Sequence, residues 1–280
     1  VIAQAKDITA AAVGSGEATA TAQGSIYAAA HAAATAAVLK AQHPKLTGVE
    51  LKALINTTAN AEVMTPDGGA QAEVSWIGHG AVDASSAQKS VLLVWDADTN
   101  QTGINFGLQE VPANQSTTLT RHIYLRNLTD KALTYKISVN ANQPERHKAL
   151  SWQHASSVTI DAGRSTLVPV SLTIDSALLA NWPMLTGDDY SAEKWRETEL
   201  DGYIQLSSEG LPTSQLAWQV RARTKADIQK NYSSFDEFLS LDGYRSTIGA
   251  KYFENYKVLA QDFKNTSDKT VEYAVYPTLR

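Results

Sequence analysis

The segment 181–199 holds the densest group of side chains that could bind a ligand. Its carboxylates are Asp188, Asp189, Glu193, Glu197 and Glu199, and Asp201 follows just after the segment. Carboxylate oxygens are the ligands that Ca²⁺ prefers, so the segment is a candidate site for structural calcium. The spacing of these residues is not that of an EF-hand, and we favour a solvated acidic loop that holds no metal.

The six histidines are the other candidates for metal binding or acid–base catalysis. No pair has the spacing of metal ligands on one helix face, such as His-x-x-x-His. We therefore predict that five of them are surface or turn residues, namely His43, His79, His122, His147 and His154. The chain has no cysteine, which excludes disulfides, thiolate nucleophiles and cysteine-based zinc sites. These residue types point to no cofactor.

Length and composition bound the partners of the chain. The 280 residues carry a net charge of −5, 43% are apolar and 19% are charged, which is typical of a globular protein rather than a disordered one. At roughly 150 residues per domain, the length predicts about two domains. A mildly acidic chain without a Lys/Arg-rich run argues against nucleic-acid binding. No stretch reaches the roughly 18–20 apolar residues that a membrane span requires.

The first 90 residues have a helical pattern. Residues 1–50 hold 17 alanines, and the run at 28–37 is nearly all alanine, which predicts a helix over Tyr27–Ala41. A helix that is apolar on all sides is normally buried, so we expect partners around it. Thr47 and Glu50 form a capping box, which predicts the start of a second helix that ends near Thr58. A turn at 78–83 precedes a short helix that reaches about Lys89.

From Val91 the pattern changes to the period of two that is typical of strands. Seven short strands are predicted, at 103–109, 117–127, 132–139, 155–160, 165–174, 200–206 and 214–222. Such a series predicts an all-β antiparallel sandwich. Beyond it lie a short helical candidate at 234–241 and a hairpin formed by 257–264 and 270–276. A lone hairpin is marginally stable, so we expect it to open a further β-module.

Four blocks of the chain resemble one protein family. Residues 23–34, QGSIYAAAHAAA, resemble the nucleophile motif of subtilisin-like serine peptidases, Gly-Thr-Ser-Met-Ala-x-Pro-His-Val-Ala-Gly. Residues 78–84, GHGAVDA, resemble the closing Gly-x-Gly-x-Val-(Asn/Asp)-Ala element, and residues 1–8, VIAQAKDI, resemble the Val-x-Ala-Pro-Gly-x-Asp-Ile strand. Residues 216–223, LAWQVRAR, are similar to the end of the fibronectin-III-like sandwich that follows the peptidase domain in secreted and cell-envelope subtilases.

The resemblance implies three parts. Residues 1–90 would be an α/β fragment, the C-terminal segment of a subtilisin-like peptidase domain. Residues 91–228 would be the fibronectin-III-like sandwich, and residues 229–280 a linker and the start of a further β-module. Residues 1–7 lack the pattern of a signal peptide, and we expect both ends to be cuts through a longer protein. That parent would be secreted or cell-surface, with a protein or peptide substrate as its partner.

The nucleophile position of the family falls on Ile26, five residues before His31. Isoleucine has no hydroxyl and cannot form an acyl-enzyme. Ser25 lies one residue early, and one helical step turns a side chain by about 100°, so its hydroxyl is a poor substitute. We instead predict that Ser25 is the N-cap of the helix. The family's catalytic Asp and His precede the nucleophile, but the only Asp before Ile26 is Asp7, which matches a strand residue, and no His precedes it.

These departures lead to the expected function. We expect the C-terminal part of a secreted subtilisin-like serine endopeptidase that is inactive on its own, in which His31 is structural rather than catalytic. The alternative is a non-catalytic pseudoprotease that acts as a binding or scaffold protein, which the further changes at Gln4, Ala5, Tyr27 and Ala30 favour. In either case residues 1–90 alone would not form a stable domain, because the Ala-rich helix would lack partners.

Overall fold

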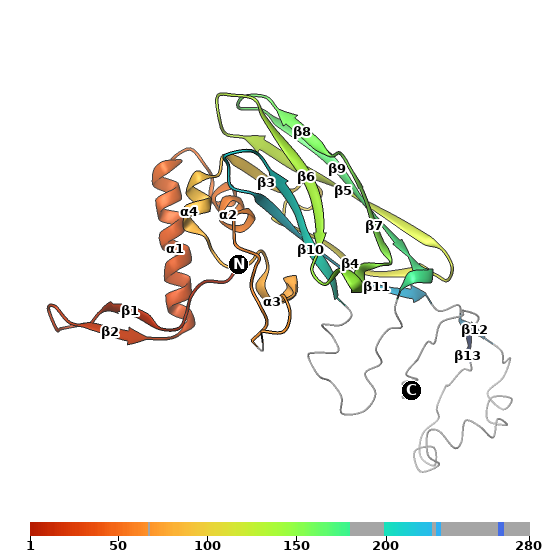
Figure 1. The fold of residues 1–280 in the computed structure, drawn as a ribbon, viewed down its shortest axis with the longest axis horizontal. Coiled ribbons are helices and arrows are strands. Elements are labelled where there is room, and N and C mark those ends of the chain that lie inside the picture. The colour runs from red at the N-terminus through yellow and green to blue at the C-terminus, as the bar shows by residue number, and fades with distance from the viewer. Residues whose placement is uncertain (67, 180–198, 226–227, 231–262, 266–280) are drawn as a thin grey trace, which may run out of the picture.

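Helices occupy the first third of the chain and strands most of the rest, and the two parts lie side by side (Figure 1). This computed structural model describes residues 1–66, 68–179, 199–225, 228–230 and 263–265. The protein is mostly β, with few helices. Within the described ranges, no helix combines the length and the apolar character that crossing a membrane would require.

Residues 1–90 form the helical part of the molecule. It contains the strands β1 (Ile8–Ala11) and β2 (Thr19–Ala22) and the helices α1 (Ser25–Gln42), α2 (Gly48–Thr57), α3 (Val74–Ile77) and α4 (Ala84–Lys89). The predicted capping box is confirmed at the start of α2, where the Thr47 amide donates to Glu50 Oε2 at 2.8 Å and the Glu50 amide donates to Thr47 Oγ1 at 3.3 Å. Asp83 caps α4 in a similar way through Ser86.

The burial expected for the Ala-rich helix is wrong. Helix α1 has 18 residues, and only Thr35 and Leu39 among them are buried. It contacts α2 and α4 on one side, and the opposite side is exposed within the described chain. The hairpin β1–β2 projects from the same end of the molecule, away from the sandwich (Figure 1). Residues 1–8, expected to be a strand, form only a single bridge at Ile2 before β1 begins at Ile8.

The strands after residue 90 form two sheets that pack face to face. The strands are β3 (Leu92–Asp96), β4 (Gly103–Pro112), β5 (Ser116–Asn127), β6 (Leu133–Ala141), β7 (Leu150–His154), β8 (Ser157–Ile160), β9 (Ser165–Asp175), β10 (Glu199–Ser207) and β11 (Ser214–Lys225). Short 3₁₀ turns lie at Pro144–His147 and Ser176–Leu178. One sheet has the order β3-β5-β9-β7 and the other the order β4-β11-β10-β6-β8. Apolar side chains from both sheets fill the space between them, with Trp218 fully buried at its centre.

Consecutive strands link the two sheets at both sides of the sandwich. β3 is the edge of the four-stranded sheet, and the next strand, β4, is the edge of the five-stranded sheet. At the opposite side β7 and β8 have the same relation. This arrangement corrects the expectation of a wholly antiparallel sandwich, because β4 pairs in parallel with β11. The reason is that the chain passes from β3 in one sheet to β4 in the other, where β4 runs in the same direction as β11.

The helical part and the sandwich share one apolar core. Leu54 of α2 and Leu93 of β3 belong to the same buried cluster, which also includes Leu39 of α1. At its rim the Arg126 guanidinium of β5 donates from Nη1 to Glu50 Oε1 at 2.7 Å, close to the start of α2. Helix α2 is therefore held between α1 and the four-stranded sheet, and the described chain packs as a continuous unit across the position 90 boundary.

All seven predicted strands are present, and their bounds differ from the prediction by a few residues. Two strands of the sandwich, β3 and β7, were not predicted, nor was the hairpin β1–β2 in the helical part. Of the predicted tail, the short pair β12 (Ile228–Lys230) and β13 (Phe263–Asn265) is described. The helical candidate at 234–241 and most of the hairpin at 257–276 lie outside the described residues. The division into three domains stays a prediction.

Candidate functional site

The first candidate site is the start of α1, where the resemblance placed a nucleophile. The helix begins at Ser25 itself, and Gly24 occupies the cap position with φ +147° and no side-chain cap. The predicted N-cap role of Ser25 is therefore wrong, since the backbone reaches helical geometry one residue earlier than expected. Ile26 follows with 74% of its side chain exposed, so its hydrocarbon surface meets solvent.

His31 does not lie beside Ser25. Six residues along an α-helix correspond to a rise of about 9 Å and a rotation of about 240°. The two side chains are exposed and emerge from different faces and turns of α1. A general base must lie within hydrogen-bond reach of the nucleophile's hydroxyl, which this pair does not provide. That Ile26 occupies the family's nucleophile position, and that Ser25 is a poor substitute for the nucleophile, stay predictions.

Buried polar groups join the helical part to the sandwich. Asn56, near the end of α2, donates from Nδ2 to Thr102 Oγ1 at 2.7 Å, and His79 Nε2 donates to the Thr102 carbonyl. Burial lowers the pKa of His79 to about 4, so the imidazole is neutral near pH 7. These bonds attach α2 and the turn after α3 to the loop that precedes β4.

The outward face of β10 forms a second attachment, to the start of α3. The Val74 amide donates to Asp201 Oδ2 at 2.5 Å, and the Ser75 amide donates to Glu199 Oε1 at 3.0 Å. Burial raises the pKa of Asp201 to about 6, opposed by the Val74 hydrogen bond and reinforced by the Glu199 and Glu73 carboxylates. The strand is thus buried on both faces, by the other sheet and by the helical part.

Glu199 and Asp201 are therefore not part of an acidic calcium loop. They are strand residues whose carboxylates accept backbone amides of α3. The other four acidic residues of that candidate, Asp188, Asp189, Glu193 and Glu197, lie outside the described residues. Among the residues that the structure describes, no group of three or more His, Cys, Asp or Glu side chains could hold a metal ion.

The histidines divide into surface and buried residues. His122 lies at the surface, with Nδ1 3.2 Å from Asp98 Oδ1, and His154 Nδ1 donates to the Ala155 carbonyl at 2.8 Å. His79 lies in a turn, as the prediction allowed, but neither it nor His147, at the end of the 3₁₀ segment Pro144–His147, lies at the surface, since they are 6% and 7% exposed. His147 Nε2 accepts from the Asp201 amide at 2.9 Å. Both are buried because the helical part and the loop after β6 cover the five-stranded sheet.

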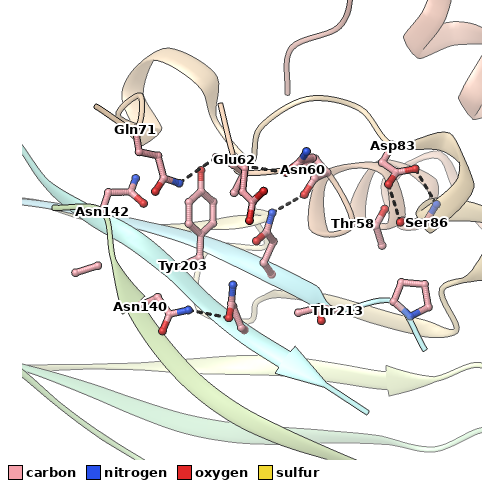
Figure 2. A pocket seen from close by; sticks show the side chains of 16 residues that line it. Thr58, Asn60, Glu62, Gln71, Asp83, Ser86, Asn140, Asn142, Tyr203 and Thr213 are labelled. Carbon is pink, nitrogen blue, oxygen red and sulfur yellow. Dashed lines mark hydrogen bonds between the residues drawn. The ribbon is translucent and has the colours of Figure 1, made fainter. Parts of the chain in front are cut away.

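The second candidate site is a cavity of about 430 Å³ between the helical part and the outward face of the five-stranded sheet (Figure 2). We call it the amide pocket, because six Asn and Gln side chains contribute to its wall. It is lined by Thr58, Ala59, Asn60, Ala61, Glu62, Gln71, Asp83, Ser86, Asn140, Ala141, Asn142, Tyr203, Gln205, Pro212, Thr213 and Gln215. These residues come from the chain after α2, the start of α4, and the strands β6, β10 and β11.

Hydrogen bonds within the protein hold the wall of the amide pocket in place. Tyr203 donates its hydroxyl to the Gly78 carbonyl at 3.2 Å, and Gln215 Nε2 donates to the Ala59 carbonyl. Gln71 Nε2 donates to the Ala61 carbonyl at 3.0 Å. Figure 2 shows Gln71 and Tyr203 at the cavity, with Tyr203 between the loop after α2 and the sheet. No sequence pattern indicated this site, because polar residues on one face of a strand are ordinarily solvated.

Comparisons with known proteins assign the chain to no family. No family model matches the sequence, and no curated protein is significantly similar to it. Solved structures that are similar include a FixG-related protein from Vibrio parahaemolyticus, with 12% identity, coverage of 39% of this chain and 94% of that chain, and a TM-score of 0.25. The secreted serine protease VesC from Vibrio cholerae has 13% identity, coverage of 51% and 26%, and a TM-score of 0.27.

The MSP family member WR4 from C. elegans gives a similar result, with 14% identity, coverage of 48% of this chain and 98% of that chain, and a TM-score of 0.24. Likenesses with TM-scores of this size carry no argument about activity or ancestry. The β-sandwich architecture of this chain is established by its own strand pairing and by the core between its sheets.

Proposed function

We propose that this chain is a non-catalytic C-terminal part of a secreted subtilisin-like protein, in which the sandwich supports the last elements of the peptidase-like domain. The proposal rests on the sequence resemblance of residues 1–90. The observation that carries its non-catalytic character is Ile26, which has a branched hydrocarbon side chain at the family's nucleophile position, exposed at the start of α1.

The contacts between the helical part and the sandwich are consistent with a sandwich that stabilises the peptidase-like elements. Leu54 and Leu93 share a buried cluster, and the Asn56–Thr102 bond crosses the same interface. The α3 amides are bonded to carboxylates of β10. An interface that combines an apolar core with satisfied buried polar groups restricts relative motion of the parts it joins.

The test uses the chain with an unfolded protein substrate and a fluorophosphonate probe. We expect no peptide release and no labelling, because no described residue provides a base hydrogen-bonded to a hydroxyl at the start of α1. Ile26→Ser introduces a hydroxyl, and we still expect no labelling, since none of the described residues supplies that base. Ser25→Ala is the matched control for reaction one residue earlier. Turnover with labelling at Ser25 that this control abolishes would overturn the proposal.

A second candidate function is a pseudoprotease scaffold whose entire peptidase domain has lost catalysis. The motif changes at Gln4, Ala5, Tyr27 and Ala30 favour it, because a single engineered or recent loss would alter the nucleophile alone. The sequence that precedes residue 1 in the parent protein separates the two. Intact Asp and His motifs there would indicate an altered enzyme, whereas their loss would indicate a scaffold.

A further inference from the structure

We propose that the amide pocket binds an uncharged, polyhydroxylated ligand, namely the end of a neutral oligosaccharide. This site is separate from the start of α1, and the inference does not depend on the proposed function. Its volume of about 430 Å³ falls within the range of small-molecule sites in proteins. The chemical class of the ligand follows from the groups that the pocket presents.

The side-chain amides of the pocket include donors and acceptors that are not used by the hydrogen bonds within the wall. Because Gln71 and Gln215 bond through their amide nitrogens, their side-chain oxygens are left to accept. Asn60 Oδ1 accepts from the Glu62 amide at 2.9 Å, which leaves its amide nitrogen to donate. Gln205 Oε1 likewise accepts from Asn140 Nδ2 at 2.7 Å, and its nitrogen is left to donate. A sugar hydroxyl both donates and accepts, so it matches such a mixed wall.

The charge of the lining excludes anionic ligands. No Lys, Arg or His side chain is among the residues that line the pocket, whereas Glu62 and Asp83 are. Both oxygens of Asp83 already accept hydrogen bonds from Ser86 at the start of α4. A phosphate, a sulfate or a carboxylate would therefore meet a negative wall without a compensating cation, while a neutral polyol would not.

The position of the pocket on the sheet argues against an extended peptide. A peptide that binds to a sheet gains most of its affinity by adding a strand to an exposed edge. The middle strand under the pocket, β10, is paired on both sides there, whereas Asn140 and Ala141 of β6 and Gln215 of β11 pair with β10 alone. Across β10 the backbone groups are therefore used by the sheet, and a ligand there meets side chains only. Hydroxyl groups can satisfy side-chain amides without an edge.

The wall is also held before any ligand arrives. Tyr203 and Gln215 are buried and bonded to backbone carbonyls of the helical part, and Asn140 and Gln205 are bonded to each other across β6 and β10 (Figure 2). Polar groups that are already ordered lose little conformational entropy when a ligand binds. The pocket thus requires both parts of the molecule to be docked.

The test measures binding of three neutral tetrasaccharides, cellotetraose, maltotetraose and chitotetraose, to the whole chain by saturation-transfer NMR. The side-chain amide signals of ¹⁵N-labelled protein report the site directly. We expect at least one of the sugars to bind and to shift the amide signals of Asn140 and Gln205. Asn140→Leu and Gln71→Ala should each weaken binding about tenfold, because each removes or releases hydrogen-bonding groups of the wall.

Thr134→Val is the matched control, because it also removes a cross-strand side-chain hydrogen bond of β6, the one to Thr159, but outside the pocket. It should leave sugar affinity unchanged. Gln71 lies in a loop, so its variant keeps the test valid if Asn140→Leu does not fold. Absence of binding by all three sugars, equal affinity in the folded pocket variants, or displacement of a bound sugar by an uncharged hexapeptide would overturn the proposal.

Discussion

Helices α1 and α2 are neighbours of similar apolar character, yet they differ in how much of each helix is buried. Helix α1 has 18 residues and buries two of them, whereas α2 has ten and buries six. The difference lies in the partners, since α2 is enclosed by α1, α4 and the sandwich, and α1 has neighbours on one side only within the described chain. Most helical stability in proteins comes from tertiary packing, so α2 should be the more stable of the two.

The largest effect that separates the two helices should come from cavity formation. Leu54→Ala removes a side chain with no exposed surface between α2 and β3, and we expect it to lower the free energy of unfolding by about 2–5 kcal/mol. Val38→Ala on α1 is the control, because 47% of that side chain is exposed, and its cost should stay below about 0.5 kcal/mol. Urea denaturation followed by tryptophan fluorescence measures both. Equal costs would contradict the comparison.

The next effect concerns how closely two segments of the helical part, the chain after α2 and the turn after α3, approach each other. Gly80 has φ +109°, and a Cβ there would overlap the carbonyl oxygen of Asn60. Gly80→Ala should therefore cost about 2–4 kcal/mol from backbone strain and overpacking together. Gly16→Ala in the β1–β2 hairpin is the control, with φ +76° but nothing within 4 Å, and should cost only about 1 kcal/mol. Thermal unfolding of both variants decides whether these two segments pack closely enough to exclude a Cβ at Gly80.

A pH-dependent effect probes the interface between the helical part and the sandwich. The pKa of Asp201 is raised to about 6 in the folded protein, so the unfolded chain loses this proton first, and stability falls as the pH rises from about 4 to about 6. The pKa of His79 is lowered to about 4, so its contribution is lost as the pH falls from about 6.5 to about 4. The two trends oppose each other, and the wild type should change little over this range on their account.

Asp201→Asn removes one of the two trends. We expect it to raise the free energy of unfolding by about 1–3 kcal/mol at pH 7.5, since a buried charge is replaced by a neutral acceptor, and to have little effect at pH 4. The variant should also lose stability on acidification, because only the His79 trend remains. Urea titrations at several pH values provide the measurement. A variant that is less stable than wild type at pH 7.5 would show that the ionised carboxylate is needed.

The smallest effect compares the starts of the two helices. Thr47→Ala breaks the capping box of α2 and should cost about 1 kcal/mol. Ser25→Ala at the start of α1 should be nearly neutral, because Ser25 makes no side-chain cap. The difference is measurable as a shift in Tm. A larger cost for Ser25→Ala would mean that its hydroxyl has a structural partner.

Sequence patterns correctly predicted the features that depend only on residues close together in the chain. The capping box at Thr47 and Glu50 depends on neighbours three residues apart, and alternation along β5 reflects one buried and one outer face. β3 was not predicted, because its sequence LLVWD is almost continuously apolar and does not alternate. Its side chains are buried on both faces, one against the other sheet and one against α2.

The candidate sites were less predictable than the strands. Ile26 could be identified because it occupies a position in a contiguous motif. The amide pocket could not, because Gln71, Asn140 and Gln205 are far apart in the chain and meet only after the helical part docks on the sheet. The burial of His79 and His147 was not predicted either, because nothing in their immediate sequence indicates that His79 contacts the loop before β4 or that His147 contacts Asp201 and Trp218.

The passage of the chain from one sheet to the other at both sides also affects how the sandwich unfolds. β3 continues into β4 on one side and β7 into β8 on the other, so each side is closed by a covalent connection between neighbouring edges. The connection between β7 and β8 consists only of Ala155 and Ser156, so the sheets cannot separate at that side without unpairing one of these strands. We therefore expect the sandwich to melt in a single cooperative step, with no long-lived species in which one sheet stands alone.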